Sequence, residues 1–222
     1  MVLKQYDFIE IEYTGRIKES TSNPSEKNGL VFDTTDAMIA KKNEVKPTQM
    51  PVIICLGDGE IVRGLDNFLV GKDLGTYSVD VSCDEAFGRK DSNLLQLVPM
   101  KQFEDQRIRP VPGLRLNIDG NLGTVRAISG GRIVVDFNHP LASKEVHYEI
   151  TVKRVLTNAE EKLRAWVKRA FGPAEVQVEG TNASVTVPSG FPLDLAVPAA
   201  KHISDRTGLT VTFFQASPAS MK

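Results

Sequence analysis

Hydrophobic and polar residues alternate strictly in three stretches that lie far apart in the chain. The alternation covers residues 9–13, 77–82 and 146–153. A period of two is typical of a strand that buries one face against a core and exposes the other to solvent. We therefore expect the three stretches to pair in one antiparallel sheet, with the side chains of Tyr13 and Tyr148 pointing inward.

A different pattern fills residues 51–75. The continuous apolar run 51–56 predicts a strand that is covered on both faces. Glycines break the run at 57–59, and over 61–69 apolar residues recur at spacings of three, four and seven, which predicts a short helix. Such a helix, laid across a curved sheet, can form the floor of an apolar pocket. The residues nearest the break fit either that floor or ordinary core packing: Ile61, Val62 and Leu65.

Polar residues dominate the segment between the first predicted strand and this stretch. Residues 14–30 predict a surface loop before a short strand around Phe32. Asp-Thr-Thr-Asp at 33–36 offers side-chain oxygens for a turn or a helix N-cap. The lysine-rich, turn-prone residues 37–49 predict an exposed flap.

Residues 90–137 carry a pattern of their own. Short apolar runs are separated by the hairpin signals Asp119-Gly120 and Gly130-Gly131, which predicts three short strands with a lead-in arm broken at Pro99. The apolar content exceeds what so small a core can bury. Part of it could bind unfolded chains, or the segment could be only a folded insertion; the residues alone leave both open.

The last region, residues 157–222, predicts the element order α-β-β-α-β. Either Thr157 with Glu160 or Asn158 with Glu161 can cap its first helix, which should end at Gly172-Pro173. A domain this small gains stability from a partner surface, so we expect it to form a homodimer or to cap the first domain.

Composition narrows the functional classes. The chain has 222 residues and a formal net charge of -1, which argues against nucleic acid as a partner. No apolar stretch approaches the ~20 residues that span a bilayer, and no apolar signal core opens the chain. Cys55 and Cys83 lack CxxC spacing, so we expect reduced thiols and a cytoplasmic protein with no membrane partner.

The sequence offers no obvious covalent chemistry. The three histidines are scattered, whereas metal sites gather several ligands at short spacing: His139, His147 and His202. No Ser-His-Asp or Cys-His set stands out, although order along the chain does not exclude one. We expect neither a metal nor another cofactor.

Several short motifs occur in a definite order: Tyr13-Thr14-Gly15, Phe32-Asp33-Thr34-Thr35, LGDGEIVRGLD at 56–66, FLVGKDLG at 68–75, Glu85-Ala86-Phe87-Gly88 and Asn138-His139-Pro140-Leu141-Ala142. This set resembles the signatures of the FKBP-type peptidyl-prolyl isomerases, in particular the SlyD-type branch and its long archaeal members. The resemblance covers residues 1–155 closely and the remainder loosely.

The resemblance implies an α+β fold in three parts. Residues 1–89 and 138–156 would form an FKBP-like domain, a twisted antiparallel sheet with one short helix. Residues 90–137 would form a small all-β domain inserted in the flap, with a chaperone-like role. The α-β-β-α-β region 157–222 would follow as a separate α+β domain.

The resemblance also implies a set of site residues. Tyr13 and Asp33 would form a polar edge, and the backbone NH of Val62 would bind a substrate carbonyl. Side chains would line the rest of the cleft: Phe32, Val52, Ile61, Leu65, Phe87, Leu141 and Tyr148. Leu65 replaces a tryptophan of human-type members and Phe87 a frequent tyrosine, which puts macrolide binding in doubt.

The implied activity is peptidyl-prolyl cis-trans isomerisation on unfolded or proline-containing polypeptide clients. Rotation about an X-Pro amide breaks no bond, so a nucleophile is unnecessary. The alternative is a holdase chaperone in which the cleft only binds extended peptides. Tyr13 and Asp33 favour the enzyme, while Leu65 and Phe87 leave the binding protein possible.

Overall fold

A computed structural model of the chain describes residues 1–222 except 19–28, 119, 189–190 and 217–222. The chain divides into two compact units, each described by itself below. One comprises Met1–Arg16, Val31–Val79 and Tyr148–Lys222, and the other comprises Ile17–Leu30 and Asp80–His147. The three-domain boundaries expected from sequence do not coincide with this division and stay a prediction.

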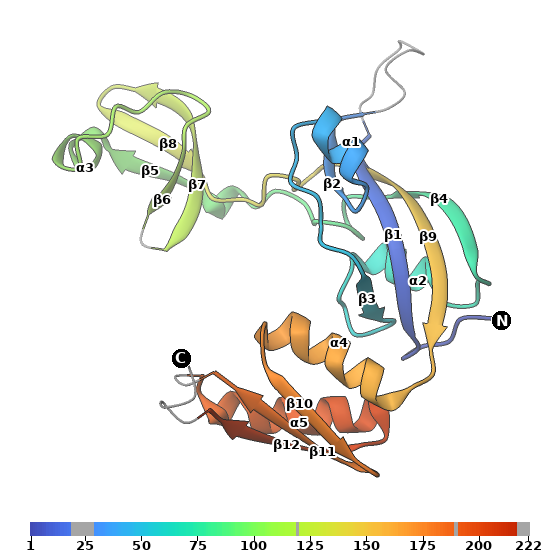
Figure 1. The fold of residues 1–222 in the computed structure, drawn as a ribbon. Helices are drawn as coiled ribbons and strands as arrows, with labels where there is room; N and C mark the ends of the chain where they lie inside the picture. Colours follow the sequence, from blue (N-terminus) through green and yellow to red (C-terminus); the bar gives the residue numbers. More distant parts are fainter. Residues whose placement is uncertain (19–28, 119, 189–190, 217–222) are drawn as a thin grey trace. The chain divides into compact units, whose positions relative to one another are not determined.

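The three alternating stretches are strands of a single five-stranded sheet, as predicted (Figure 1). Its order is β2-β1-β9-β4, and β3 pairs with β1; both β2 and β3 run antiparallel to β1. The strands are β1 (Phe8–Ile17), β2 (Val31–Thr34), β3 (Val52–Cys55), β4 (Gly75–Val81) and β9 (Val146–Leu156).

The predicted start of the surface loop, at residue 14, is three residues or more too early, because β1 continues to Ile17. Gly15 and Arg16 pair with Asp33 and Val31 of β2. The antiparallel partner therefore extends a strand whose polar sequence suggested a loop. The centre of the predicted loop, 19–28, lies outside the described residues.

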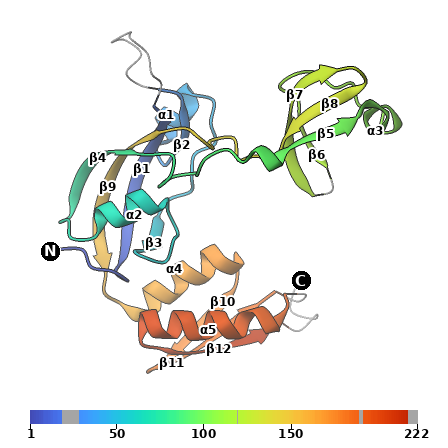
Figure 2. The same cartoon turned by 180° about the vertical axis from the view of Figure 1, so that it is seen from behind.

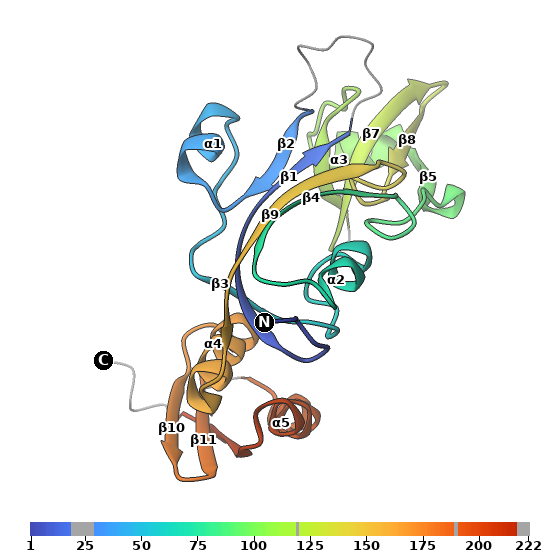
Figure 3. The same ribbon diagram turned by 90° about the vertical axis from the view of Figure 1, so that its right-hand side faces the viewer.

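Helix α2 (Arg63–Leu69) follows the glycine break, and the sheet curves around it (Figure 3). Gly57 has a φ of 85°, in the left-handed region, and its NH donates to Asp66 Oδ1 at 2.9 Å. Leu56 and Leu69 are fully buried on either side of the break. The short helix is thus held between its glycine turn and the sheet.

The predicted flap begins with a helix. Helix α1 (Ala37–Lys42) starts at Asp36, whose Oδ1 accepts from the NH groups of Met38 at 2.7 Å and Ile39 at 3.0 Å. The N-cap expected in the Asp-Thr-Thr-Asp segment is therefore confirmed. The lysine-rich composition did not predict this helix. Its stability comes from the Asp36 cap and from the packing of Ala40, its one buried residue.

The second unit contains a four-stranded antiparallel sheet of order β5-β8-β7-β6. Its core is small and apolar, formed by Val98, Phe103, Val125, Ile133 and Val135. Its elements are the 3-10 turn η2 (Ser92–Leu94), β5 (Leu95–Pro99), α3 (Met100–Asp105), β6 (Arg115–Ile118), β7 (Asn121–Ser129) and β8 (Arg132–Asp136).

The lead-in arm expected before this module is a fourth strand and a short helix, so that expectation was wrong. Pro99 ends β5 and stands at the N-cap of α3. Proline is tolerated there because no NH hydrogen bond of a helix interior is lost. Of the two hairpin signals, Gly130-Gly131 joins β7 to β8, while Asp119 lies outside the described residues.

The C-terminal elements follow the predicted order α-β-β-α-β (Figure 2). Asn158 caps the first helix, accepting the NH of Glu161 at 2.9 Å, and Gly172 ends it at a φ of 72°. β12 runs parallel to β11, as a helical crossover allows. The elements are α4 (Ala159–Phe171), β10 (Glu175–Glu179), β11 (Asn182–Val187), α5 (Leu193–Thr207) and β12 (Thr210–Gln215).

Among the described residues, no helix is both long and apolar enough to cross a membrane.

A buried carboxylate lies where the chain enters and leaves the four-stranded sheet. The Asp136 side chain is 2 % exposed and accepts from Lys90 Nζ at 3.2 Å and Arg126 Nη2 at 2.9 Å. Asn138 donates to it through its backbone NH at 2.9 Å and its amide at 2.8 Å. Burial alone would raise the pKa of Asp136, but the bonds from Asn138, Arg126 and Lys90 hold it well below its usual range.

This cluster predicts a loss of stability in acid. Because the folded pKa of Asp136 lies below the unfolded value of ~3.9, its contribution is complete above that pH and is lost as the pH falls below it. Asp136→Asn should cost about 2 kcal/mol at pH 7 and flatten the acid decline. Urea titrations that follow NMR amide signals of β7 and β8 at pH 7 and pH 3 measure both effects. Equal acid declines in the two proteins would contradict the assignment.

Candidate functional site

Tyr13 and Asp33 meet across the β1–β2 pair. The Tyr13 hydroxyl donates to Asp33 Oδ2 at 2.8 Å. Thr48 Oγ1 donates to Asp33 Oδ1 at 2.8 Å and lies 3.4 Å from the Tyr13 hydroxyl. The pKa of Tyr13 is raised to about 12, chiefly by burial; Asp33 contributes to the rise, and the hydrogen bond with Thr48 opposes it. The phenol is therefore protonated at neutral pH, and each oxygen of the carboxylate accepts from a hydroxyl.

Backbone and threonine hydrogen bonds hold this group in place. The backbone NH of Tyr13 donates to Thr35 Oγ1, and its carbonyl accepts the NH of Thr35, both at 2.9 Å. Thr34 is fully buried, its Oγ1 lies 2.8 Å from Thr14 Oγ1, and its carbonyl accepts the NH of Thr48 at 2.8 Å. The motif threonines thus fix both strands and the distant Thr48.

Aromatic side chains form a wall beside the carboxylate. The rings of Phe32 and Tyr148 lie 5.8 Å apart at 88°, and those of Tyr13 and Tyr148 lie 6.3 Å apart at 60°. These are edge-to-face arrangements that aromatic pairs prefer. Tyr148 is 6 % exposed, and burial raises its pKa well above the ordinary value. Phe32, Tyr148, Tyr13 and Asp33 therefore form one contiguous group, called here the tyrosine–aspartate site.

Sequence reasoning missed two members of this arrangement. Gly15 belongs to the Tyr13-Thr14-Gly15 motif, but the sequence did not indicate its role. A Cβ at Gly15 would lie 2.6 Å from Phe32 Cζ and 2.9 Å from Tyr148 Cε1, so glycine is what lets the rings approach β1. Thr48 was assigned to an exposed flap, and nothing local in its sequence distinguishes it from the other flap residues.

The predicted floor residues belong to the turn and start of α2, on the concave side of the same sheet (Figure 3). Leu65 is 2 % exposed, while Ile61 and Val62 are half-buried. Val62 is the N-cap of α2, and its carbonyl accepts the NH groups of Leu65 and Asp66 at 3.0 Å. Val52, half-buried, pairs with Ile11 of β1. Their contact with a substrate stays a prediction.

Phe87 and Leu141 belong to the second unit, where their two motif loops pack together. The Phe87 ring stacks on His139 with centroids 4.8 Å apart and planes inclined by 5°. The NH of Leu141 donates to His139 Nδ1 at 3.2 Å, and the NH of Ser143 donates to the Gly88 carbonyl at 2.7 Å. The predicted position of Phe87 and Leu141 opposite the tyrosine–aspartate site stays a prediction.

The other two histidines are hydrogen-bonded to aspartates. His147 Nδ1 lies 2.7 Å from Asp80, and His202 Nε2 lies 2.9 Å from Asp58. Across the described part of the chain, no group of three or more His, Cys, Asp or Glu side chains has the arrangement of a metal site.

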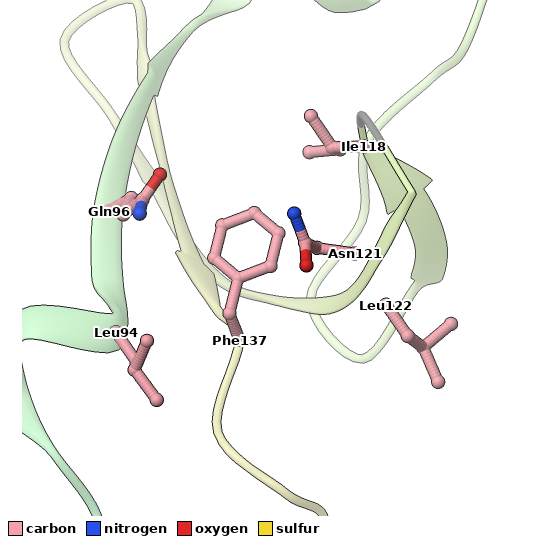
Figure 4. Close-up of a pocket in the computed structure, with 6 residues that line it drawn as sticks. All are labelled: Leu94, Gln96, Ile118, Asn121, Leu122 and Phe137. Atoms are coloured by element: carbon pink, nitrogen blue, oxygen red, sulfur yellow. The ribbon is translucent and has the colours of Figure 1, made fainter. Parts of the chain in front are cut away.

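A second concave feature lies on the four-stranded sheet (Figure 4). It is an open groove whose apolar side chains remain accessible, Leu122 being 58 % and Leu94 39 % exposed. In Figure 4 the ring of Phe137 lies at the centre, between the amides of Gln96 and Asn121. The lining residues, called here the insert groove, are Leu94, Gln96, Ile118, Asn121, Leu122 and Phe137.

Comparisons with known proteins identify relatives of this chain. A family model described as "FKBP26, IF domain" matches residues 96–141, which include most of the four-stranded sheet. A short-type peptidyl-prolyl cis-trans isomerase of Methanocaldococcus jannaschii is 25% identical over 158 residues, 69% of this chain and 94% of that protein. The SlyD isomerase of Treponema pallidum is 29% identical over 166 residues, 72% of this chain and 82% of that protein.

A third relative extends over less of this chain at higher identity. The FKBP-type 16 kDa peptidyl-prolyl cis-trans isomerase of Escherichia coli K12 is 35% identical over 112 residues, which make up 47% of this chain and 74% of that protein. The motif resemblance to the FKBP-type and SlyD-type isomerases is thereby confirmed, while the assignment to the long archaeal members stays a prediction. The chain belongs to the FKBP-type peptidyl-prolyl cis-trans isomerases.

Proposed function

We propose that this chain isomerises X-Pro bonds of unfolded or partly folded polypeptides at the tyrosine–aspartate site, without a covalent intermediate. The observation that carries the proposal is the Tyr13–Asp33–Thr48 hydrogen-bonded group beside the edge-to-face rings of Phe32 and Tyr148. It combines a preorganised polar edge with an apolar wall. The names of the relatives support the reaction type.

The physical basis of the reaction is the resonance of the amide. Rotation about the C–N bond faces a barrier of ~18–20 kcal/mol because it removes that resonance. The twisted amide is less charge-separated than the planar one, so an apolar wall that excludes water from its carbonyl favours it. An acceleration of ~10⁵ requires only ~7 kcal/mol of such differential stabilisation.

Each residue then has a role. Phe32 and Tyr148 provide the apolar wall, and Asp33, held by two hydroxyl donors, provides a fixed hydrogen-bond acceptor at its edge. Ile61 and Leu65 bind the proline ring, with Val52 beside them, while the NH of Val62 binds a substrate carbonyl and sets the orientation of the peptide. No step involves a nucleophile, a metal or another cofactor.

We propose in addition that the insert groove holds the client chain. Exposed leucines in a groove on a module with so small a core support this role. Tethering raises the local concentration of prolines at the isomerase domain, which offsets weak sequence recognition. Homodimerisation through the C-terminal domain stays a separate prediction.

The test is proline-limited refolding of a model protein with this chain at a small fraction of its concentration. Unassisted, that phase takes tens to hundreds of seconds, and catalysis should accelerate it severalfold. Leu122→Asp in the insert groove, or deletion of residues 90–136, should slow catalysed refolding roughly tenfold while short-peptide isomerisation persists. Because Leu122 is mostly exposed, its substitution leaves the core intact.

Two outcomes would contradict the proposal. If aggregation of the model protein falls while the slow phase is unchanged, the chain is a holdase and not a catalyst of refolding. If peptide and protein substrates lose activity equally in Leu122→Asp, the insert groove has no specific role in client binding.

A further inference from the structure

The turn between β3 and α2 carries two carboxylates, directly before Ile61 and Val62. Although the turn lies at the surface, the side chains of Asp58 and Glu60 are only 5 % and 11 % exposed. Charged groups that leave water need partners to offset the desolvation cost. Neither motif resemblance nor the roles proposed above account for this burial.

The partners of Asp58 come from helix α5 of the C-terminal region. Arg206 donates to Asp58 Oδ1 through Nη2 at 2.8 Å and Nε at 3.0 Å, and His202 Nε2 lies 2.9 Å from Oδ2. The guanidinium also lies over the ring of Tyr6, 3.5 Å from its centroid. Burial alone would raise the pKa of Asp58, but Arg206, Cys55 and His202 hold it below its usual range.

Glu60 is held by helix α4, although burial raises its pKa above the usual value. Its Oε2 accepts the backbone NH of Cys55 at 2.7 Å, and its Oε1 pairs with Arg169. Arg169 also donates to the carbonyl of Ile53 in β3 at 2.6 Å. Arg169 therefore binds both strand β3 and the turn that follows it.

Apolar packing accompanies these ion pairs. Phe8 of β1 and Cys55 of β3 belong to one buried core with residues of the C-terminal region, among them Leu163 and Trp166 of α4 and Ile203 of α5. On its other side the turn is tied to α2 by the bond from the NH of Gly57 to Asp66. The turn is thus bound at both ends, and α4 and α5 supply the cations that its two acids require.

We propose that Arg206, Arg169 and His202 are positioning residues, through which the C-terminal helices hold the 57–60 turn and set the backbone of Ile61 and Val62 for substrate. The proposal rests on the function proposed above for these two residues. It assigns the C-terminal region a part in the isomerase site itself. A shift of about 1 Å in a binding group is enough to weaken its contact with the substrate strongly.

The experiment compares Arg206→Gln and Arg169→Gln in the full chain with the wild type. Short X-Pro peptides give KM and kcat separately, and hydrogen exchange of residues 57–62 reports the turn. Because the NH of Val62 contributes binding, KM should rise roughly 5- to 10-fold with kcat changed less than about twofold. Exchange at the turn should accelerate by about tenfold, and Arg206→Lys, which keeps the charge, should restore part of both.

Arg164→Gln provides the matched control. Arg164 also lies on α4, but it pairs with Glu160 of the same helix at 2.7 Å and is half exposed. Its substitution should leave KM and the turn unchanged, whereas unfolding midpoints measured in parallel show any general loss of stability. Should Arg206→Gln fail to fold, Arg206→Lys and Arg169→Gln provide the same comparison.

The outcomes separate this inference from the proposed function. Faster exchange of the turn with an unchanged KM would overturn the positioning role, as would an equal rise of KM in Arg164→Gln. If the wild type does not isomerise peptides, the proposed function fails. In that case, unchanged hydrogen exchange of residues 57–62 in Arg206→Gln would overturn the positioning role as well.

Discussion

Asp33→Ala is expected to lower kcat/KM for X-Pro peptides roughly 10- to 100-fold, which corresponds to about 1.4–2.7 kcal/mol of lost transition-state stabilisation. The substitution removes the carboxylate that both Tyr13 and Thr48 bind. Two half-buried hydroxyls then lose their acceptor, and their orientation beside the aromatic wall is no longer fixed. A protease-coupled or NMR exchange assay with short peptides measures the effect.

Asp36→Ala is the matched control, since Asp36 lies three residues further along in the same motif. Its carboxylate caps α1 and has no bond to Tyr13. It should cost about 1 kcal/mol of stability, the usual value of an N-cap, with little change in turnover. Equal losses of activity in both variants would mean that the motif supports the fold and that Asp33 has no particular role in the reaction.

Gly15→Ala should disrupt the aromatic wall. The added methyl would lie 2.6 Å from Phe32 and 2.9 Å from Tyr148, so at least one ring must move. Both rings are packed edge to face, and a displacement on the order of 1 Å should reduce turnover by about 10- to 100-fold. The same strain should cost about 1–3 kcal/mol of stability. Peptide kinetics and urea unfolding measure the two effects.

Gly123→Ala introduces a comparable clash elsewhere. Its Cβ would lie 2.6 Å from Val135 and 2.9 Å from Phe137, both in the second unit. We expect it to destabilise the four-stranded sheet to a similar degree while short peptides are still turned over. If Gly15→Ala leaves peptide kinetics at the wild-type level, the rings of Phe32 and Tyr148 do not form the substrate wall.

Local patterns alone predicted much of the fold. Period-two alternation identified β1, β4 and β9, and a capping residue and a glycine set the limits of α4. These features succeed because they depend on residues that are neighbours in sequence. The motif order also identified the family, and Tyr13, Asp33, Phe32 and Tyr148 do form one contiguous group.

Only the tertiary structure decided the contacts between distant segments. Thr48 reaches Asp33 because the flap folds back on β2, and Gly15 is required only because two rings from other strands meet above it. In the sequence, Asp58 and Glu60 are ordinary acidic residues of a turn. Their arginine partners lie on helices more than 100 residues further along the chain. The physical reason is the same in each case: hydrogen bonding and packing depend on proximity in space, which spacing along a single chain does not encode.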